Sequence, residues 1–289
     1  MSAWIGRRVL AGFPALAVLA LVALGCGSER PSSPAAAASY GAPPANGGFD
    51  YQIGGDYPLP RGVTVVSRDW FSGDAAEEPT YSICYVNAYQ TQADEPGVDR
   101  PDERSNWPRG LVLNELGDDP HWGGEYLVDI STASKRRRAA RWLGQMIDAC
   151  ARKGYEGVEY DNLDSWTRFD GTPLEDEVPF GKREAIAFAR LLAARAHARG
   201  LAVAQKNTVE ITRGQARGVG FDFTIAEECA RYRECDAYRR VYRDRMIAIE
   251  YRRLFFNQAC RMIGDEVSVV LRDRRVSRPG SRTYVYDAC

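Results

Sequence analysis

Two acidic residues that each follow a short apolar segment offer the clearest chemistry in this chain. Asp161 ends the segment 157–161, and Glu227 follows the segment 221–226. Two carboxyl groups that flank a sugar bond can hydrolyse it, because one protonates the leaving oxygen while the other attacks the anomeric carbon or activates water. We therefore take Asp161 and Glu227 as candidate catalytic residues for glycoside hydrolysis. The sequence leaves open whether they are close enough for a retaining mechanism or far enough apart for an inverting one.

Lys206 follows another apolar segment, 201–205, and lies between the two acids in the sequence. Its charge would lower the pKa of a neighbouring carboxyl group and so help to separate a proton donor from an ionised partner. A purely structural ion pair is the alternative. Asp164 and Glu228 each adjoin a stronger candidate, so holding that neighbour in place is the simpler role for them.

Further residues near the segment ends are candidate contacts for a sugar polymer. Aromatic rings can stack on sugar rings, although ordinary packing explains each ring about equally well; these candidates are Tyr85, Trp122, Tyr160, Trp166 and Tyr251. Polar candidates are Glu125, Asp129, Asn162, Asp164, Asn207 and Glu250. So many acids would be costly to bury without partners, which favours a functional surface over a core.

The elements that must position these residues are short strands alternating with amphipathic helices. Eight segments are rich in β-branched or aromatic residues: 62–67, 81–86, 126–130, 157–161, 201–205, 221–226, 246–250 and 267–271. Strand–helix alternation predicts parallel strands, and eight of them predict a single (β/α)8 barrel whose strand ends form one functional rim. An open doubly wound sheet is the alternative, but no glycine-rich phosphate loop follows the first strand. A stretch at 49–53 is expected to add an accessory strand below the barrel.

Two of the connecting segments have recognisable boundaries. The first is expected to be a helix that begins at Ser131 or Thr132, either of which can cap it, and that runs to about Arg152. A second helix is expected after Gly181. A polar stretch at 90–109 follows a predicted strand, so we expect it to project over the rim; a mobile insertion is the alternative.

The N-terminal residues predict export. A charged start, an apolar run at 9–24 and small residues before Cys26 are typical of a secretory signal. We expect a signal peptide at 1–25, a lipidated flexible tether at 26–48 that carries its lipid on Cys26, and the catalytic domain at 49–289. An uncleaved membrane anchor is the alternative, although the apolar run is short for a span of roughly 20 residues. The expected location is the bacterial cell envelope, with the domain anchored to a membrane through the lipid.

Six cysteines follow the tether, and an even number suggests disulfides in an exported chain. The possible pairs are Cys229 with Cys235, Cys260 with Cys289, and Cys84 with Cys150. The first pair would close a local loop and the second would fix the C-terminal segment. The third follows by elimination, with two buried free thiols as the alternative.

Charge and histidine content argue against several other functions. The net charge is -1, so nothing indicates nucleic-acid binding. The chain has two histidines, at His121 and His197, and no two cysteines in a CxxC pair. We therefore expect neither a metal site nor a cofactor.

Several sequence blocks, in their order, resemble the endo-α-1,4-polygalactosaminidase family, glycoside hydrolase family 114. The blocks cover nearly everything after the tether and include 51–55, 83–85, 124–130, 153–164, 196–207 and 221–235. The resemblance implies a (β/α)8 barrel that cleaves α-1,4-linked galactosamine polymers, with Asp161 as nucleophile and Glu227 as acid/base. An acidic rim would suit such an amino-sugar polysaccharide, because unacetylated galactosamine is cationic.

The chain departs from the family pattern at positions expected on the rim. Ala226 stands where the family commonly has Asn, Ala204 and Gln205 replace Gly-Leu, and the stretch after Tyr85 also differs. These changes concern the substrate more than the fold. Two alternatives stay open: a non-catalytic polysaccharide-binding barrel lipoprotein, which the change at Ala226 favours, and a barrel hydrolase for a different glycan or an ester. The absence of a G-x-S-x-G motif disfavours the α/β-hydrolase route.

Overall fold

The computed structural model describes residues 41–71, 73–92 and 106–289. The predicted signal peptide, Cys26 and much of the stretch 90–109 therefore lie outside the described residues. Nine strands form one sheet in their sequence order. They are Gly48–Gln52 (β1), Val63–Asp69 (β2), Tyr81–Asn87 (β3), Gly157–Asp161 (β4), Ala202–Lys206 (β5), Phe223–Glu227 (β6), Met246–Glu250 (β7), Ser268–Arg272 (β8) and Tyr286–Ala288 (β9).

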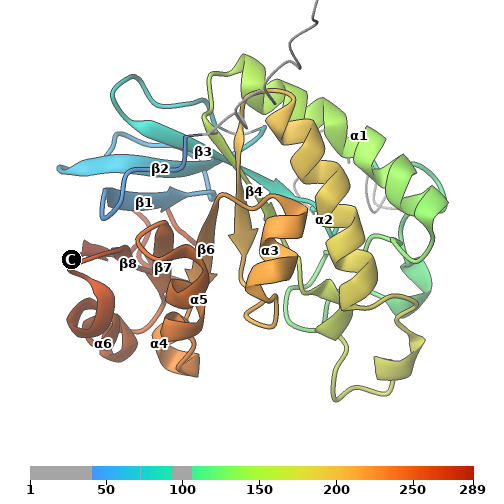
Figure 1. Cartoon of the computed structure of the whole chain (residues 1–289). Coiled ribbons are helices and arrows are strands. Elements are labelled where there is room, and N and C mark those ends of the chain that lie inside the picture. Colours follow the sequence, from blue (N-terminus) through green and yellow to red (C-terminus); the bar gives the residue numbers. More distant parts are fainter. Residues whose placement is uncertain (1–40, 72, 93–105) are drawn as a thin grey trace, which may run out of the picture. The chain divides into compact units, whose positions relative to one another are not determined.

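The sheet curves into a nearly closed barrel (Figure 1). Strands β1 to β8 are parallel, and β9 pairs antiparallel with β8. The first and the last of the parallel strands approach one another where buried Arg272 of β8 pairs with buried Asp50 of β1 at 2.8 Å. A cluster of apolar side chains, including Phe49 and Ile249, fills part of the interior. The prediction of a (β/α)8 barrel is confirmed.

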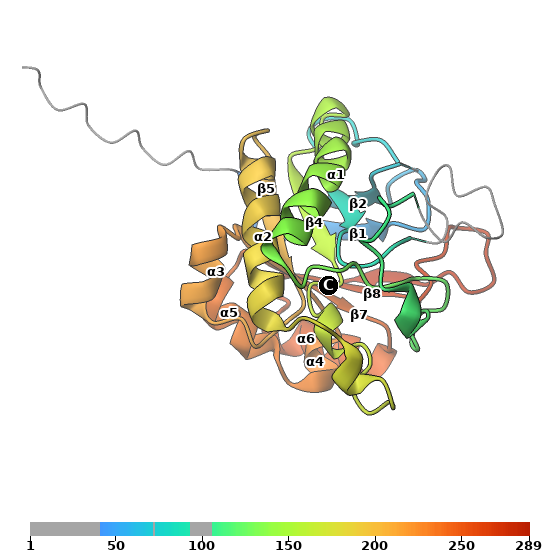
Figure 2. The same cartoon turned by 90° about the vertical axis from the view of Figure 1, so that its right-hand side faces the viewer.

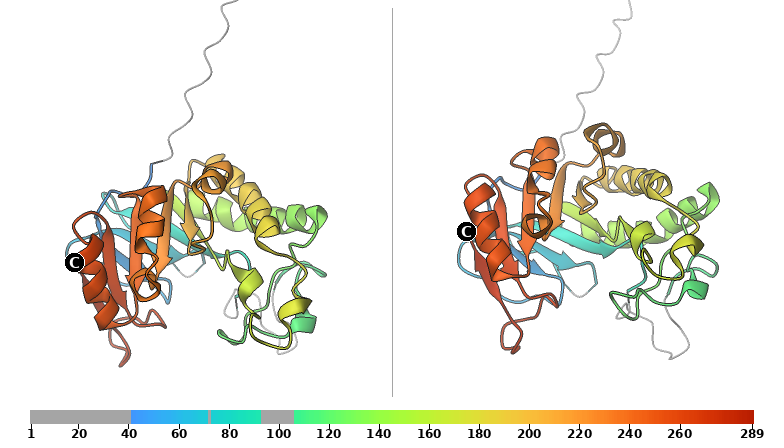
Figure 3. Two further views of the ribbon diagram at one scale, coloured as in Figure 1. Left: turned by 60° about the horizontal axis from the view of Figure 1, so that its bottom comes forward. Right: turned by 90° about the horizontal axis from the view of Figure 1, so that it is seen from below.

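Helices follow the later strands. They are Ala133–Arg152 (α1), Lys182–His197 (α2), Arg213–Val219 (α3), Cys229–Tyr232 (α4), Cys235–Tyr242 (α5) and Arg253–Ile263 (α6). Three short 3-10 helices span Asn114–Leu116, Ser165–Thr167 and Glu175–Glu177. Helices α1 and α2 pack side by side (Figure 2), and α6 lies at the other end of the row of strands (Figure 3). The described residues between β1, β2 and β3 hold no helix.

The two helices predicted from capping residues begin close to where the sequence places them. Thr132 caps α1, and its side chain accepts a hydrogen bond from the backbone of Lys135. Gly181 precedes α2, where the side chain of Glu184 accepts a hydrogen bond from the Gly181 backbone. No helix within the described ranges is both long enough and apolar enough to cross a membrane.

Two strand predictions are wrong. Residues 49–52 of the stretch 49–53 belong to β1, a full member of the barrel, and the segment 126–130 is not one of its strands. In that segment Leu127 and Val128 form only isolated antiparallel bridges, to Gln90 and Val112. Leu127 and Val128 are both fully buried although they are neighbours in sequence, so packing from two sides explains the apolar run without a place in the sheet.

All three expected disulfides are present. Cys84 of β3 bonds Cys150 of α1, which ties a barrel strand to the helix that covers it. The other two bonds join Cys229 to Cys235 and Cys260 to Cys289. The bond between Cys229 and Cys235 holds together the start of α4 and the start of α5, directly after β6.

Candidate active site

A cavity of about 620 Å³ opens at the C-terminal ends of the strands. The side chains that reach it from separate strands include Tyr51 of β1, Tyr85 of β3, Asp161 of β4 and Glu227 of β6, with Tyr251 directly after β7. The C-terminal rim is where barrel enzymes assemble catalytic groups, because parallel strands bring residues from distant parts of the chain to one edge.

Asp161 is held by hydrogen bonds to both of its carboxylate oxygens. The Tyr85 hydroxyl donates to Oδ2 at 2.8 Å, while Lys206 Nζ and the Asn162 backbone N–H donate to Oδ1 at 3.0 and 2.8 Å. Burial alone would raise the pKa of Asp161, but the Lys206 charge and these hydrogen bonds lower it below its ordinary value. The group is therefore ionised at neutral pH.

Glu227 is fixed from two sides. The Tyr251 hydroxyl donates to Oε1, and the Asn207 side-chain amide donates to Oε2 at 2.9 Å. The oxygen of the same side-chain amide, Asn207 Oδ1, accepts a hydrogen bond from the Glu227 backbone N–H at 2.8 Å. Asn207 thus holds both the main chain and the carboxyl group of Glu227, so its amide is a positioning group for this acid.

Lys206 lies beneath the two acids and contacts both of them. Its Nζ lies 3.0 Å from Asp161 Oδ1 and 3.6 Å from Glu227 Oε2, and it also donates to the Tyr51 hydroxyl at 3.0 Å. The side chain is fully buried and does not line the cavity. Burial would lower the pKa of Lys206, but the surrounding carboxylates raise it well above its ordinary value. The lysine is therefore a buried cation between acids, and it does not contact the cavity.

Left-handed backbone conformations are concentrated at the strand ends that carry these groups. Asn162, directly after β4, has φ 63°, and Glu228, directly after β6, has φ 54°. After β5, Asn207 and Thr208 have φ 46° and 65°. Asn enters this region more readily than most residues, whereas a β-branched Thr is strained there, and such strain gathers at functional sites. These turns aim the side chains of three neighbouring strand ends at the cavity.

Acids from the loops after β3 and β4 extend the cavity wall. Glu125 accepts a hydrogen bond from Asn87 at 2.9 Å, and burial raises the pKa of Glu125 to about 8. Arg168 lies 3.1 Å from Asp164 and 3.4 Å from Asp119. All of these groups except Asn87 line the cavity.

Several residues expected to contact substrate lie elsewhere. Asp129 is bound by Lys135 and Ser131 at the start of α1, and Tyr160 donates to a backbone carbonyl of α2. Trp166 packs against the outer apolar core. Asp129 and Tyr160 are buried, and none of these three residues lines the cavity.

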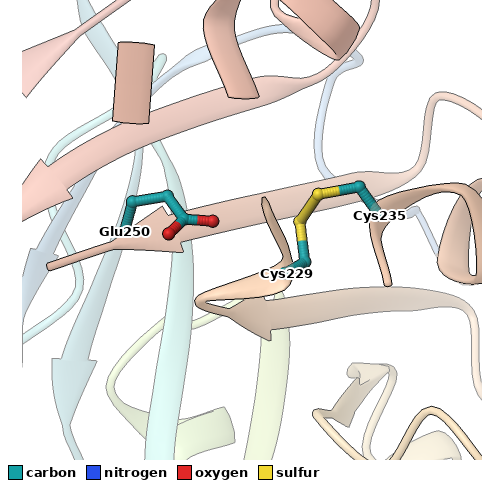
Figure 4. Close-up of side chains that lie close together, drawn as sticks. All are labelled: Cys229, Cys235 and Glu250. Carbon is teal, nitrogen blue, oxygen red and sulfur yellow. A yellow bond between two sulfur atoms is a disulfide. The ribbon is translucent and has the colours of Figure 1, made fainter. Parts of the chain in front are cut away.

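Glu250 also lies away from the cavity, beside the Cys229–Cys235 disulfide (Figure 4). Its Oε1 accepts a hydrogen bond from the Ala230 backbone at 2.8 Å, and burial raises its pKa to about 7. Potential ligand atoms of Cys229, Cys235 and Glu250 lie within 4.8 Å of one another. The two sulfur atoms are joined to each other, however, and the sulfur ligand of a metal is a thiolate.

The cavity also contains residues that the sequence did not single out. Tyr51 was missed because its strand was taken as accessory, although its place in a barrel strand points it inward. Arg168 lies in a loop after a 3-10 helix, where no periodic pattern exists to find it. Tyr232 and Arg274 line the outer wall from α4 and from the loop after β8.

Solved structures share this fold, among them the following two. The crystal structure of Aspergillus fumigatus Ega3 in complex with galactosamine is 21% identical, covers 85% of this chain and 96% of that chain, and has a TM-score of 0.67. The glycoside hydrolase domain of PelA from Pseudomonas aeruginosa is 15% identical, with coverage of 81% and 96% and a TM-score of 0.52. No curated protein sequence matches the chain.

A family comparison decides the assignment. The model of glycoside-hydrolase family GH114 matches residues 30–289, which is most of the chain and includes every strand of the barrel. The protein therefore belongs to glycoside-hydrolase family GH114.

Proposed function

We propose that this glycoside hydrolase cleaves internal bonds of α-1,4-linked galactosamine polymers, with Asp161 as nucleophile and Glu227 as acid/base. The observation that carries the proposal is one buried ammonium, Lys206 Nζ, in contact with both carboxyl groups at the floor of an open cavity. A pair of acids needs different protonation states to share such a reaction. Here Asp161 takes the closer contact with the cation and has the lowered pKa.

The spacing is compatible with a retaining mechanism, which we propose. Because Asp161 Oδ1 and Glu227 Oε2 both contact Lys206 Nζ, these two oxygens are no more than about 6.6 Å apart. Retaining enzymes hold their carboxyl groups ~5–5.5 Å apart, whereas inverting enzymes need ~6.5–9.5 Å to place a water molecule. Asp161 would attack the anomeric carbon while Glu227 protonates the leaving oxygen, and Glu227 would then deprotonate the water that releases the sugar.

An amino sugar suits the charge of the cavity. Among the described residues, eight carboxyl groups line it against three guanidinium groups; the acids are Asp119, Glu125, Asp161, Asp164, Glu210, Glu227, Glu228 and Glu234, and the cations are Arg168, Arg274 and Arg275. Even with Glu125 and the proton donor Glu227 neutral, carboxylates outnumber guanidinium groups, and this excess of negative charge attracts a cationic polymer. The solved structure of Ega3 contains galactosamine, which fits the same substrate class.

Internal cleavage fits the open form of the site. Trp122 and Tyr232 line the cavity with 46% and 56% of their surface exposed. Both rings are available for stacking on sugar units beyond the cleaved bond. A polymer could thus cross the site without entering by its end.

The direct test is digestion of de-N-acetylated α-1,4-galactosamine polymer, with reducing ends counted and the anomer of the first product followed by NMR. Asp161→Asn and Glu227→Gln should each lower the rate by at least a hundredfold, and the first product should keep the α configuration. Asp148→Asn is a matched control, because Asp148 of α1 pairs with Arg195 of α2 and with Arg199 just after α2, away from the cavity. Full activity of either active-site variant, or binding of polymer by the unaltered protein without cleavage, would contradict the proposal.

We also propose that Cys26 carries a lipid that anchors the domain to a membrane of the cell envelope. The support is the signal-like sequence before Cys26 and the small, polar composition of the tether after it. Cys26→Ser should move the protein from the membrane fraction to the soluble fraction and abolish incorporation of labelled palmitate. Unchanged fractionation and labelling would refute the anchor while leaving the catalytic proposal untouched.

A further inference from the structure

One acid in the cavity wall, Glu125, is buried without a cation in contact with it. The residue is 8% exposed, lines the cavity, and accepts a hydrogen bond from the Asn87 side chain on Oε2 at 2.9 Å. Within the part of the chain that the structure describes, Oε1 has no hydrogen-bond partner and no lysine or arginine pairs with this carboxyl group. Arg168, a cation of the same wall, pairs with Asp119 and Asp164 instead. A buried carboxylate ordinarily has a partner, so the arrangement needs a physical reason.

Hydrogen bonds fix Glu125 beside Asp161. Asn87, which donates to Glu125, ends β3 and pairs in register with Asp161 on β4. The side-chain oxygen of Asn87 accepts a hydrogen bond from Asn162 Nδ2 at 2.9 Å, and Asn162 directly follows Asp161. Neighbouring strands lie ~4.8 Å apart, so the carboxyl group of Glu125 belongs to the part of the wall next to the proposed nucleophile.

The loop that carries Glu125 is held in place by its own hydrogen bonds. The Asp119 backbone N–H donates to the Glu125 carbonyl oxygen at 2.7 Å. Asp119 Oδ1 accepts from the backbone N–H groups of His121 and Trp122 at 2.7 and 3.1 Å. The carboxyl group of Glu125 is therefore in position before a ligand arrives, and a group placed in advance loses little freedom on binding.

The empty cavity does not favour a charged Glu125. Burial raises the pKa of Glu125 to about 8, against the hydrogen bond from Asn87, which favours the charged form. The negative charges of Asp161 and Asp119 raise this pKa further, and the positive charge of Arg168 opposes them. A cation that enters the cavity would stabilise the carboxylate, whereas a neutral group would not. The partner that the described residues do not supply is thus one that a cationic ligand can supply.

We propose that Glu125 is a specificity-determining residue that binds the ammonium group of the sugar unit attacked by Asp161, and so selects unacetylated galactosamine over its N-acetylated form. The inference rests on the proposed function, because it concerns the substrate of the same site. Galactosamine carries its amino group on C2, the carbon next to the one that Asp161 attacks. When the ammonium binds, a protonated Glu125 releases its proton to water, and Oε1 accepts a charge-assisted hydrogen bond. An acetamido group has no positive charge and cannot replace that contact.

Calorimetric titration near neutral pH tests the inference without turnover. The ligands are a short de-N-acetylated α-1,4-galactosamine oligosaccharide and its N-acetylated counterpart, and the protein carries Glu227→Gln to prevent cleavage. Adding Glu125→Gln, which keeps the shape of the side chain and removes its charge, should weaken binding of the unacetylated ligand about tenfold and leave the acetylated ligand within about twofold. Tenfold is near the lower end for a hydrogen bond to a charged group, because the ionisation of Glu125 offsets part of the gain.

Two results of this titration would overturn the proposal. One is equal weakening for both ligands, which indicates a purely structural role for Glu125. The other is unchanged binding of the unacetylated ligand in Glu125→Gln. A protein with unaltered Glu125 that binds the two ligands equally, or binds neither of them, overturns it as well.

Two further variants separate recognition of charge from a structural role. Glu125→Asp keeps the charge on a shorter side chain, so it should retain part of the preference for the unacetylated ligand that Glu125→Gln loses. If Glu125→Gln does not fold, Glu125→Asp carries the test, and an unchanged preference in it would contradict the proposal. Glu250→Gln is the matched control, because Glu250 is also a buried glutamate, whose pKa burial raises to about 7, but it does not line the cavity. Its preference should not change.

Cleavage rates distinguish a failure of this inference from a failure of the proposed function. If Glu125 governs binding of the unacetylated ligand but the enzyme with an intact Glu227 releases no reducing ends from polymer, only the proposed function fails. If the enzyme cleaves acetylated and unacetylated polymer equally well, and Glu125→Gln does the same, only the inference about Glu125 fails.

Discussion

Replacing Lys206 with Met should change both the pH profile and the stability of the enzyme in a linked way. Methionine keeps most of the length of the side chain and removes the charge that contacts Asp161, Glu159 and Glu227. In the folded protein burial would raise the pKa of Asp161. The charge of Lys206, the largest opposing influence, helps to lower it below its ordinary value. Without the lysine it should rise by about 1–3 units. The acid limb of kcat/KM, which reports ionisation of the proposed nucleophile, should move to higher pH by the same amount.

The loss of stability should depend on pH. Removing one member of a buried ion pair typically costs about 3–5 kcal/mol, because the remaining charge is left without a partner. Lys206, whose pKa is raised on folding, contributes stability below its unfolded pKa that is lost only as the pH rises through the higher folded value. In the variant the carboxyl groups can escape the penalty by binding protons. The deficit should therefore be largest at neutral pH and shrink as the pH falls.

Urea unfolding and initial rates, both measured from about pH 4 to about pH 9, test this prediction. Lys135→Met is the matched control, because Lys135 pairs with Asp129 outside the cavity and is partly exposed. It should cost about 1–3 kcal/mol, because Asp129 is buried and loses one partner, but it should leave the acid limb in place. If Lys206→Met loses the same stability at every pH and keeps the acid limb of the unaltered enzyme, the account of Lys206 as the charge that holds Asp161 ionised is wrong.

Two further predictions concern groups around the site. Tyr251→Phe removes the hydroxyl that donates to Glu227. We expect kcat to fall by about ten- to a hundredfold with little change in melting temperature. An unchanged kcat would contradict a positioning role for Tyr251. Replacing Cys84 and Cys150 with Ala opens a span of 66 residues and should cost about 4 kcal/mol of unfolding free energy, against about 2 kcal/mol for Cys229 and Cys235, whose span is 6. The shorter loop, closed by the Cys229–Cys235 disulfide, includes Tyr232 in the cavity wall. Removing that disulfide should therefore raise KM for polymer more than removing the Cys84–Cys150 disulfide does. Equal effects on KM would contradict this.

The sequence predicts the barrel well because most of its strands show their character locally. Short apolar segments followed by helices with clear caps, such as Thr132, are visible without knowledge of neighbours. The errors arise where contacts with other parts of the chain determine the local structure. The segment 126–130 has the composition of a strand but is buried by packing in a loop. The stretch at 49–53 forms a barrel strand although the residues between it and β2 hold no helix.

The site is predictable to the extent that strand ends converge. Asp161, Glu227, Lys206 and Asn207 come together because each ends or directly follows a strand. Glu250 also ends a strand, yet its side chain turns toward the Cys229–Cys235 disulfide, and the sequence gives no indication of that direction. Whether a loop residue reaches the site depends on contacts that form only in the folded chain.

The ion pair between Asp50 and Arg272 links residues 222 positions apart. Contacts so distant in sequence form late, because a long loop of chain must first lose its freedom. The first strand of the barrel is thus the first to be made and among the last to find both of its neighbours. Until these contacts form, one edge of a largely apolar sheet is exposed to proteases and to other unfolded chains. An enzyme built in this way would depend on chaperones during folding more than its final compactness suggests.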